Sequence, residues 1–253
     1  MIKTSTRDTS PVAVPKSIAA RSIDVTKEFG SGATRISVLR GADFQAEFGE
    51  MTFLVGPSGC GKTTLISVLA GLLTASSGKV EVLGKSLDQL RGGRLVDFRL
   101  QNIGFIFQQF NLLPTLSAAE NAAIPLLLRG QGFSSAVRQS GAMLEQLGIK
   151  EQKNKFPSQM SGGQQQRVAI ARALVHDPKL VICDEPTASL DAESGQKVMN
   201  LLRELAVADE RAVIVVTHDD RIFRYADRIA HMSDGKITDV DRTTATTTDG
   251  DPS

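Results

Sequence analysis

The chain has 253 residues, which is long enough to bury a core in one domain or in two closely joined lobes. Its 29 Lys and Arg residues nearly balance its 28 Asp and Glu residues, so charge favours neither nucleic acid nor an acidic membrane surface, and we expect no nucleic acid partner. The two cysteines, Cys60 and Cys183, form no framework of spaced pairs, which is typical of a reducing compartment.

Both ends of the chain are expected to be disordered tails. Residues 1–17 lack the continuous apolar segment of a secretory signal, and residues 241–253 are low-complexity Thr with Asp, Gly and Pro. Residues 18–240 form the predicted domain. Its closest approach to a membrane span, residues 122–128, is far shorter than the roughly 18 residues required, so we do not expect the chain to cross a membrane by itself.

The predicted elements begin with alternating residues in SIDVTKEF and ISVLRGADFQAEF, which is typical of antiparallel strands packed on one face. A short apolar strand at residues 51–55 then leads through a glycine-rich loop into a helix at residues 63–73. Further buried strands are predicted at residues 103–107, 180–183 and 212–216. Together these runs favour a parallel sheet between helices.

Between residues 110 and 178 the strand patterns give way to helix patterns. Ser117 with Glu120, and Ser161 with Gln164, fit the capping box, in which a hydroxyl and an acid or amide satisfy each other's backbone donors. This predicts a helical subdomain inserted into an α/β core. Asp234-Gly235 predicts the turn of a final hairpin.

The loop after the strand at residues 51–55 fits the pattern Gly-x-x-x-x-Gly-Lys-Ser/Thr. Its glycines let successive backbone N–H groups surround an anion, and the following helix start adds a partial positive charge. We expect Lys62 to reach the β and γ phosphates of a nucleotide and Thr63 to bind Mg²⁺. The alternative, a glycine-rich turn with a solvated lysine, is disfavoured by the flanking strand and helix. The predicted nucleotide-binding residues here are Gly56, Pro57, Ser58, Gly59, Cys60, Gly61, Lys62, Thr63 and Thr64.

Asp184 and Glu185 follow a buried strand, at the edge where open α/β sheets bind ligands. Asp184 can hold Mg²⁺ through water, and Glu185 can polarise an attacking water as a catalytic residue. A solvated acidic pair at a strand end is the alternative, and the nearby nucleotide loop weakens it.

A second predicted anion site is the helix that begins at Ser161, Gly162 and Gly163. Its positive end presents a hydroxyl and bare backbone N–H groups. An ordinary capped helix would explain Ser161 and Gln164, but two consecutive glycines weaken the first helical turn. We therefore expect something to approach this backbone closely.

Taken together, these motifs resemble the ATP-binding cassette (ABC) ATPases. The phosphate loop, MSGGQQQ (160–166), CDEPTASLD (183–191) and VTHDD (216–220) occur in the family's order and approximate spacing, over about residues 18–240. The resemblance implies a P-loop NTPase (RecA-like) core with an N-terminal antiparallel β subdomain and an inserted helical subdomain at about residues 110–178. It also implies two copies sandwiching two ATP, each held by one phosphate loop and by Ser161, Gly162, Gly163 and Gln164 of the other copy.

The family pattern implies further site residues. Gln108 contacts Mg²⁺ and a membrane partner, Asp191 couples the two sites of a dimer, and His218 contacts the γ phosphate as a catalytic residue beside Glu185 and Lys62. Cys60 stands where the family accepts several small residues, so we interpret it as a compact filler.

Phe29 stands where the family often places a tyrosine that stacks on adenine. The alternative, that Phe29 is a core residue, stays open because a lone aromatic is a weak signal.

The implied function is the ATP-hydrolysing subunit of an ABC transporter, with ATP and Mg²⁺ as ligands. Residues 108–130 and 224–237 resemble the branch of macrolide-efflux, lipoprotein-release, cyanobacterial glycolipid-export and FtsE-like ATPases. That branch implies an exporter or mechanotransmission-type complex at the cytoplasmic face of the inner (plasma) membrane. A separate permease would dock at Gln108 and around Phe110, Leu112 and Leu113.

Two alternatives come from other classes. A soluble ABC ATPase acting on DNA or ribosomes would be expected to carry a coiled-coil insertion, zinc-binding cysteines, a second cassette or a basic patch. A nucleotide kinase built on the same loop leaves the Ser-Gly-Gly helix unexplained.

Overall fold

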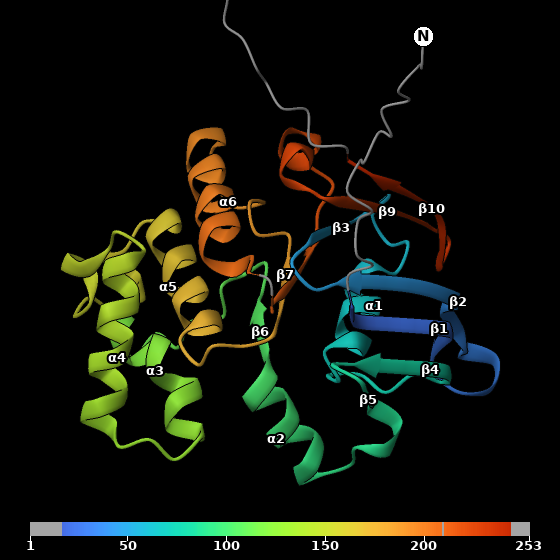
Figure 1. Cartoon of the computed structure of the whole chain (residues 1–253), viewed down its shortest axis with the longest axis horizontal. Coiled ribbons are helices and arrows are strands. Elements are labelled where there is room, and N and C mark those ends of the chain that lie inside the picture. The colour runs from blue at the N-terminus through green and yellow to red at the C-terminus, as the bar shows by residue number, and fades with distance from the viewer. Residues whose placement is uncertain (1–16, 209, 244–253) are drawn as a thin grey trace, which may run out of the picture.

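The structure is a computed structural model that describes residues 17–208 and 210–243. Figure 1 shows a parallel sheet in the middle, an antiparallel sheet on one side and a group of helices on the other. This arrangement confirms the predicted α/β class, a P-loop NTPase core with an antiparallel β subdomain and an inserted helical subdomain.

The larger sheet consists of six strands, which are β3 (Met51–Val55), β6 (Ile103–Ile106), β7 (Leu180–Asp184), β8 (Ala212–Val216), β9 (Arg228–Ser233) and β10 (Lys236–Arg242). Their order in the sheet is β10-β9-β3-β8-β7-β6. All neighbours pair in parallel except β10, which forms an antiparallel hairpin with β9. The predicted hairpin turn is confirmed, because Asp234 and Gly235 both have positive φ angles.

The smaller sheet consists of β1 (Ile18–Phe29), β2 (Ile36–Glu47), β4 (Ser77–Val82) and β5 (Lys85–Ser86). Its order is β2-β1-β4-β5 and all pairs are antiparallel, as expected for β1 and β2 from their alternation. The sequence patterns did not indicate β4 and β5.

Six α-helices lie within the described residues, and these are α1 (Lys62–Leu69), α2 (Gly93–Asn102), α3 (Ala118–Leu128), α4 (Phe133–Gln146), α5 (Gly162–Leu174) and α6 (Ala192–Ala206). Short 3₁₀ helices occur at Gly32–Thr34, Leu87–Gln89, Lys150–Gln152, Pro157–Gln159 and Asp220–Tyr225. The helix predicted at residues 63–73 ends earlier, at Leu69, because Gly71 turns the chain with a left-handed φ of 66°. Over the described stretches of chain, none of the helices is long and apolar enough to span a bilayer.

Capping boxes begin α3 and α5, as predicted. Ser117 caps α3 together with Glu120, and Ser161 caps α5 together with Gln164. In each case the serine side chain accepts from the backbone N–H three residues on, and that residue's side chain accepts from the serine N–H. The capping box therefore determines, to within about one residue, where α5 begins.

The parallel sheet separates two apolar layers. Along β8, Ile214 packs with α1 and the antiparallel sheet, whereas its neighbour Val213 packs with α5 and α6. The same alternation occurs at Ile182 and Val181 on β7. Because both faces are covered, β3, β7 and β8 are buried at every position, which explains their continuous apolar sequences.

The described chain extends slightly beyond the predicted domain at both ends. The carbonyl of Ser17 accepts from the backbone N–H of Phe48. β10 continues past residue 240 to Arg242, whose guanidinium donates to both carboxylate oxygens of buried Glu47 at 3.1 Å. The remainder of the two predicted tails lies outside the described residues.

Candidate functional site: a phosphate loop at the edge of the parallel sheet

A cavity of about 300 Å³ lies between the loop that follows β3 and the carboxyl ends of β6, β7 and β8. Because these strands are parallel neighbours, their carboxyl ends meet at one edge of the sheet, where such folds bind ligands. Its lining residues are Val38, Ser58, Gly59, Gly61, Lys62, Thr63, Thr64, Gln108, Glu185, Val216 and His218. The structure thus brings together nine of the residues singled out in the sequence, which are separated by up to 160 positions.

The loop places Lys62 at its centre. The Lys62 amino group donates to the carbonyl oxygens of Gly56 and Pro57, at 2.8 and 2.9 Å, and the side chain is largely buried. Gly61, with φ 108°, precedes the first turn of α1, so the helix N-terminus opens towards the cavity. A buried cation beside a helix start is an arrangement that suits a phosphate.

Gly56 is required by the chain's own packing. A Cβ at this position would lie 2.1 Å from the carbonyl oxygen of Met232 and 3.1 Å from the Cys60 sulfur. Gly56, Pro57 and Cys60 form the back of the loop and do not line the cavity.

Cys60 packs into the apolar core beneath the loop. Only 7% of the residue is exposed, and its sulfur lies 4.0 Å from the Lys62 amino nitrogen. This placement agrees with the interpretation of Cys60 as a compact filler.

Thr63 and Asp184 place two oxygen atoms that could act as metal ligands close together. The Thr63 hydroxyl lies 3.3 Å from Asp184 Oδ1 at the end of β7. Burial raises the pKa of the Asp184 carboxyl, and the hydrogen bond from Thr63 opposes that rise. Oxygen ligands of this kind suit Mg²⁺, which keeps several waters and binds few protein groups in nucleotide sites. The donor set therefore fits Mg²⁺ held jointly with nucleotide phosphates, and Gln108 lines the same cavity from the turn after β6.

Glu185 and His218 contact each other at the mouth of the cavity. His218 Nδ1 lies 2.7 Å from Glu185 Oε1, so a protonated Nδ1 donates to the carboxylate. Glu185 has a positive φ of 49°, which is uncommon for a non-glycine residue, and its N–H donates to the Val216 carbonyl of β8. The fixed backbone turns the carboxylate towards the cavity and away from the strand.

The predicted second anion site lies elsewhere on the surface. Ser161, Gly162, Gly163 and Gln164 begin α5, and none of them lines the cavity. A Cβ at Gly162 would lie 3.7 Å from the Ser189 carbonyl, and one at Gly163 would lie 3.8 Å from the Ser194 hydroxyl. These are ordinary contact distances, so nothing among the described residues of the chain itself requires glycine at either position.

Phe29 and Asp191 lie away from the cavity as well. Phe29 ends β1 with 41% of the residue exposed, and the Lys27 amino group lies 5.0 Å from its ring centre. The alternative that Phe29 is a core residue is therefore wrong. Asp191 caps α6, where its carboxylate accepts from the Ser194 N–H at 2.9 Å, and hydrogen bonds from Ser194 lower its pKa.

Two lining residues were missed by sequence reasoning. Val38 and Val216 provide the apolar part of the cavity wall. Val216 ends the predicted strand at residues 212–216, directly before the VTHDD motif, and this adjacency was the signal for its place. Val38 belongs to an alternating strand whose inward side cannot be known before the sheets are placed together.

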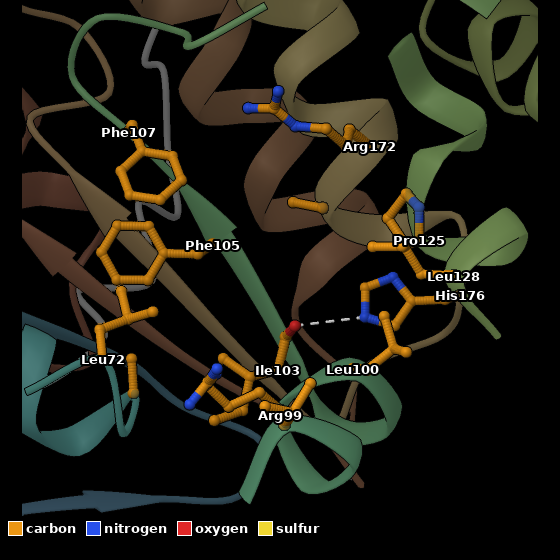
Figure 2. Close-up of a pocket in the computed structure, with 13 residues that line it drawn as sticks. Leu72, Arg99, Leu100, Ile103, Phe105, Phe107, Pro125, Leu128, Arg172 and His176 are labelled. Atoms are coloured by element: carbon orange, nitrogen blue, oxygen red, sulfur yellow. Dashed lines mark hydrogen bonds between the residues drawn. The ribbon is translucent and has the colours of Figure 1, made fainter. Parts of the chain in front are cut away.

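A second cavity, of about 340 Å³, lies between the helical subdomain and the core (Figure 2). We call it the apolar groove, and its residues are Ala70, Leu72, Val96, Arg99, Leu100, Ile103, Phe105, Phe107, Pro125, Leu128, Arg172, Ala173 and His176. Leu72, Val96 and Leu128 are exposed large apolar side chains at its surface. Burial lowers the pKa of the His176 imidazole, whose Nε2 lies 3.2 Å from the Ile103 carbonyl oxygen.

The apolar groove does not include the residues expected to form the docking surface. Phe110, Leu112 and Leu113 are absent from its lining, and Leu112 is half-buried against the apolar core. The reason is that the chain turns back after Gln108 with positive φ angles at Phe110 and Asn111. The apolar groove is therefore lined by residues before Gln108 together with residues of α3 and α5, whereas Leu113 is exposed outside it.

Comparison with known proteins gives the family. The sequence pattern of the family described as ABC transporter matches residues 39–188. The putative hemin import ATP-binding protein HrtA of Staphylococcus epidermidis is 44% identical over 216 residues, covering 85% of this chain and 96% of that protein. Its counterpart in Staphylococcus aureus strain Newman is 43% identical over 220 residues, with 85% and 97% covered.

Solved structures agree with this assignment. The ATP-binding cassette MJ0796, a dimer in a post-hydrolysis state bound to ADP and Pi, gives a TM-score of 0.82 at 35% identity, covering 88% of this chain and 98% of that one. CbiO1 of Clostridium perfringens, part of the ABC transporter complex CbiONQ, gives 0.77 at 28% identity, with 89% and 88% covered. A phosphate loop with a buried lysine, carboxylates at the adjoining strand ends and these relatives lead to one conclusion: the chain belongs to the ABC transporter family, as an ATP-binding subunit that hydrolyses ATP.

Proposed function

We propose that two copies of this chain close around two ATP molecules, and that each ATP lies between the phosphate loop of one copy and the start of α5 of the other. The observation that carries this proposal is the pair Gly162 and Gly163. Both lie in the first turn of α5, both cost helix stability, and neither is required by a contact within the described chain. An anion from a second copy would use the bare N–H groups and the Ser161 hydroxyl of this helix start.

Hydrolysis would be carried by the residues around the cavity. Lys62 binds the β and γ phosphates, and Glu185 polarises water for attack on the γ phosphate. His218 contacts the γ phosphate and donates to Glu185, which keeps the carboxylate oriented. Thr63, Asp184 and Gln108 would hold Mg²⁺, which neutralises phosphate charge when bound.

Two exposed residues would complete the nucleotide site. Phe29 offers a ring face for stacking on adenine, at a cost to its contact with Lys27. Asp191, at the start of α6, would couple the two sites across the dimer.

The membrane partner would occupy the apolar groove. A permease segment with an apolar helix face would bury Leu72, Val96 and Leu128, which are otherwise exposed. We propose a permease of the exporter or mechanotransmission type, as in the macrolide-efflux, lipoprotein-release, cyanobacterial glycolipid-export and FtsE-like branch. The chain would then act at the cytoplasmic face of the inner membrane, and the HrtA relatives make hemin the first cargo to test.

The dimer is tested with two substitutions. Glu185→Gln removes the base but keeps the size of the side chain, so ATP should bind and a stable ATP-dependent dimer should form. Adding Ser161→Arg places a bulky side chain where the partner's phosphate meets α5, so the dimer should be lost while the monomer still binds ATP. Light scattering after size-exclusion chromatography reports the dimer, and titration with a fluorescent nucleotide reports binding.

Ser117→Arg in the same Glu185→Gln background is the matched control. It removes an equivalent cap from α3, at a similar cost of about 1 kcal/mol in stability, without touching the proposed interface. The proposal fails if the Ser161 variant still dimerises with ATP. It also fails if that variant stops binding ATP, because α5 would then serve the site of its own chain.

A further inference from the structure

Arg172 connects α5 to the segment that follows Gln108. Its guanidinium donates from Nη2 to the Phe110 carbonyl and from Nη1 to the Asn111 carbonyl, each at 2.6 Å. Both carbonyls belong to residues with a left-handed φ of 48°, a conformation that Asn111 tolerates but that is uncommon for a bulky residue such as Phe110. A planar guanidinium is suited to holding two adjacent carbonyls in this way, because its donors form a rigid fork.

The segment from Gln108 to Ser117 is held to helices at two places. At its far end, buried Asn121 of α3 accepts from the Leu113 N–H and donates to the carbonyls of Leu113 and Ser117. At its near end, two residues after Gln108, the side-chain contacts are those of Arg172. The position of Gln108 in the nucleotide cavity therefore depends more directly on Arg172 than on Asn121.

Arg172 also lines the apolar groove. Figure 2 shows Arg172 and Phe107 at the same end of this groove, and Phe107 is the residue before Gln108. The Phe107 ring packs on Phe105 with ring centres 4.4 Å apart. One side chain of α5 thus contacts both the groove and the turn that presents Gln108.

We infer that Arg172 is a positioning residue that fixes the turn after Gln108 and so presents Gln108 to the nucleotide cavity. Since α5 begins at Ser161, movement of this helix is transmitted through Arg172 to the Gln108 turn. A permease segment in the groove would act on the same side chain, and that extension rests on the proposed function.

The first test needs no nucleotide. Hydrogen exchange of the full chain is followed in peptides that cover residues 107–116, for the wild type and for Arg172→Gln. Losing two charge-assisted hydrogen bonds should raise exchange in this segment by about tenfold or more. Arg167→Gln is the matched control, because Arg167 lies on the same helix and donates to the Leu147 carbonyl at 3.1 Å, away from the segment.

The second test asks whether Arg172 acts through Gln108. Steady-state hydrolysis of MgATP gives kcat and KM for Arg172→Gln, Gln108→Ala and the double variant. Arg172→Gln should lower kcat by roughly tenfold with little change in KM, because a misplaced Gln108 affects the transition state more than the phosphate loop. In the Gln108→Ala background the same substitution should have no further effect.

Arg172→Lys keeps the charge on α5 but loses the fork, so it should restore part of the exchange protection and of kcat. It also serves as the readout if Arg172→Gln does not fold. The inference is overturned if exchange at residues 107–116 is unchanged, or if Arg167→Gln raises it equally. It is overturned as well if Arg172→Gln lowers kcat by the same factor with and without Gln108. Failure of the proposed dimer would appear separately, in the Ser161 and Glu185 variants.

Discussion

Replacing Gly163 with Ala should stabilise the isolated chain and weaken its dimer. The Cβ would meet the Ser194 hydroxyl at 3.8 Å, so it fits without strain, and Gly163 lies in the helical region of backbone space. Ala is better than Gly by about 1 kcal/mol in a helix interior, and Gly163 is only the second residue of α5. A gain of about 0.5 kcal/mol is therefore expected, which corresponds to a Tm higher by about 1–2 °C in a chain of this size.

The same methyl group should obstruct the partner. If a phosphate of the second copy approaches the N–H groups of the first turn, the added Cβ occupies part of that approach. We expect at least a tenfold loss in ATP-dependent dimer affinity, which is about 1.4 kcal/mol. Thermal unfolding of the nucleotide-free chain measures the first effect, and light scattering in the Glu185→Gln background measures the second.

Gly141→Ala separates the two effects. Gly141 lies inside α4, and apart from the backbone of α4 itself no described atom lies within 4 Å of the position that an alanine Cβ would take. Ala should therefore stabilise by about 1 kcal/mol and leave the dimer unchanged. The reasoning is refuted if Gly163→Ala destabilises the monomer, since an internal contact must then require glycine. It is refuted equally if Gly163→Ala dimerises as well as the parent chain.

Three other outcomes are expected. A maleimide should label Cys60 slowly and Cys183 more slowly still, because both are buried and burial raises the pKa of the Cys183 thiol. MgATP should slow the labelling of Cys60 further, and equal labelling rates of Cys60 with and without MgATP would contradict the placement of the loop. Leu128→Glu should leave ATP hydrolysis by the isolated chain intact but weaken permease binding by about tenfold in a pull-down titration. Leu113→Glu lies outside the groove and should leave permease binding unchanged, and the reverse result would show that the docking surface lies around Leu113 instead. Burial lowers the pKa of His176, so just below pH 6.5 the unfolded state binds more protons than the folded state. The free energy of unfolding that the neutral imidazole contributes is therefore present above that pH and is lost as the pH falls. Urea unfolding at several pH values should show a smaller loss of this free energy in His176→Gln than in the wild type, and an equal loss would refute the assignment.

The parallel sheet and the phosphate loop were predictable because each has a local cause. Strands buried on both faces must be apolar along their whole length, and β3, β7 and β8 are. The loop and its neighbouring carboxylates follow those strands directly, so placing the strands also places Lys62 and Glu185. The capping box at Ser161 fixed the start of α5 in the same local way.

Other features depend on contacts between distant residues and left no local pattern. β5 is an edge strand of only two residues, and only Val80 and Val82 of β4 are buried, so these sequences carry too short an apolar alternation to predict strands. The apolar groove exists because α2, α3 and α5 leave Phe105 and Phe107 uncovered, and no spacing in the chain reports that arrangement. The left-handed turn at Phe110 contradicts its local preference and is held by Arg172, 62 residues away.

A direct backbone contact between β6 and α5 links the apolar groove to the nucleotide cavity. A Cβ at Gly104 would lie 2.2 Å from the Ala173 carbonyl, so β6 and α5 touch without any intervening side chain. β6 leads to Gln108 at one end, and α5 begins at Ser161, where a second copy would bind. Two elements packed this closely cannot slide past each other without a clash, because the contact offers no flexible side chain to absorb the shift. If the proposed dimer closes and displaces α5, we expect β6, the Gln108 turn and the wall of the apolar groove to move with it.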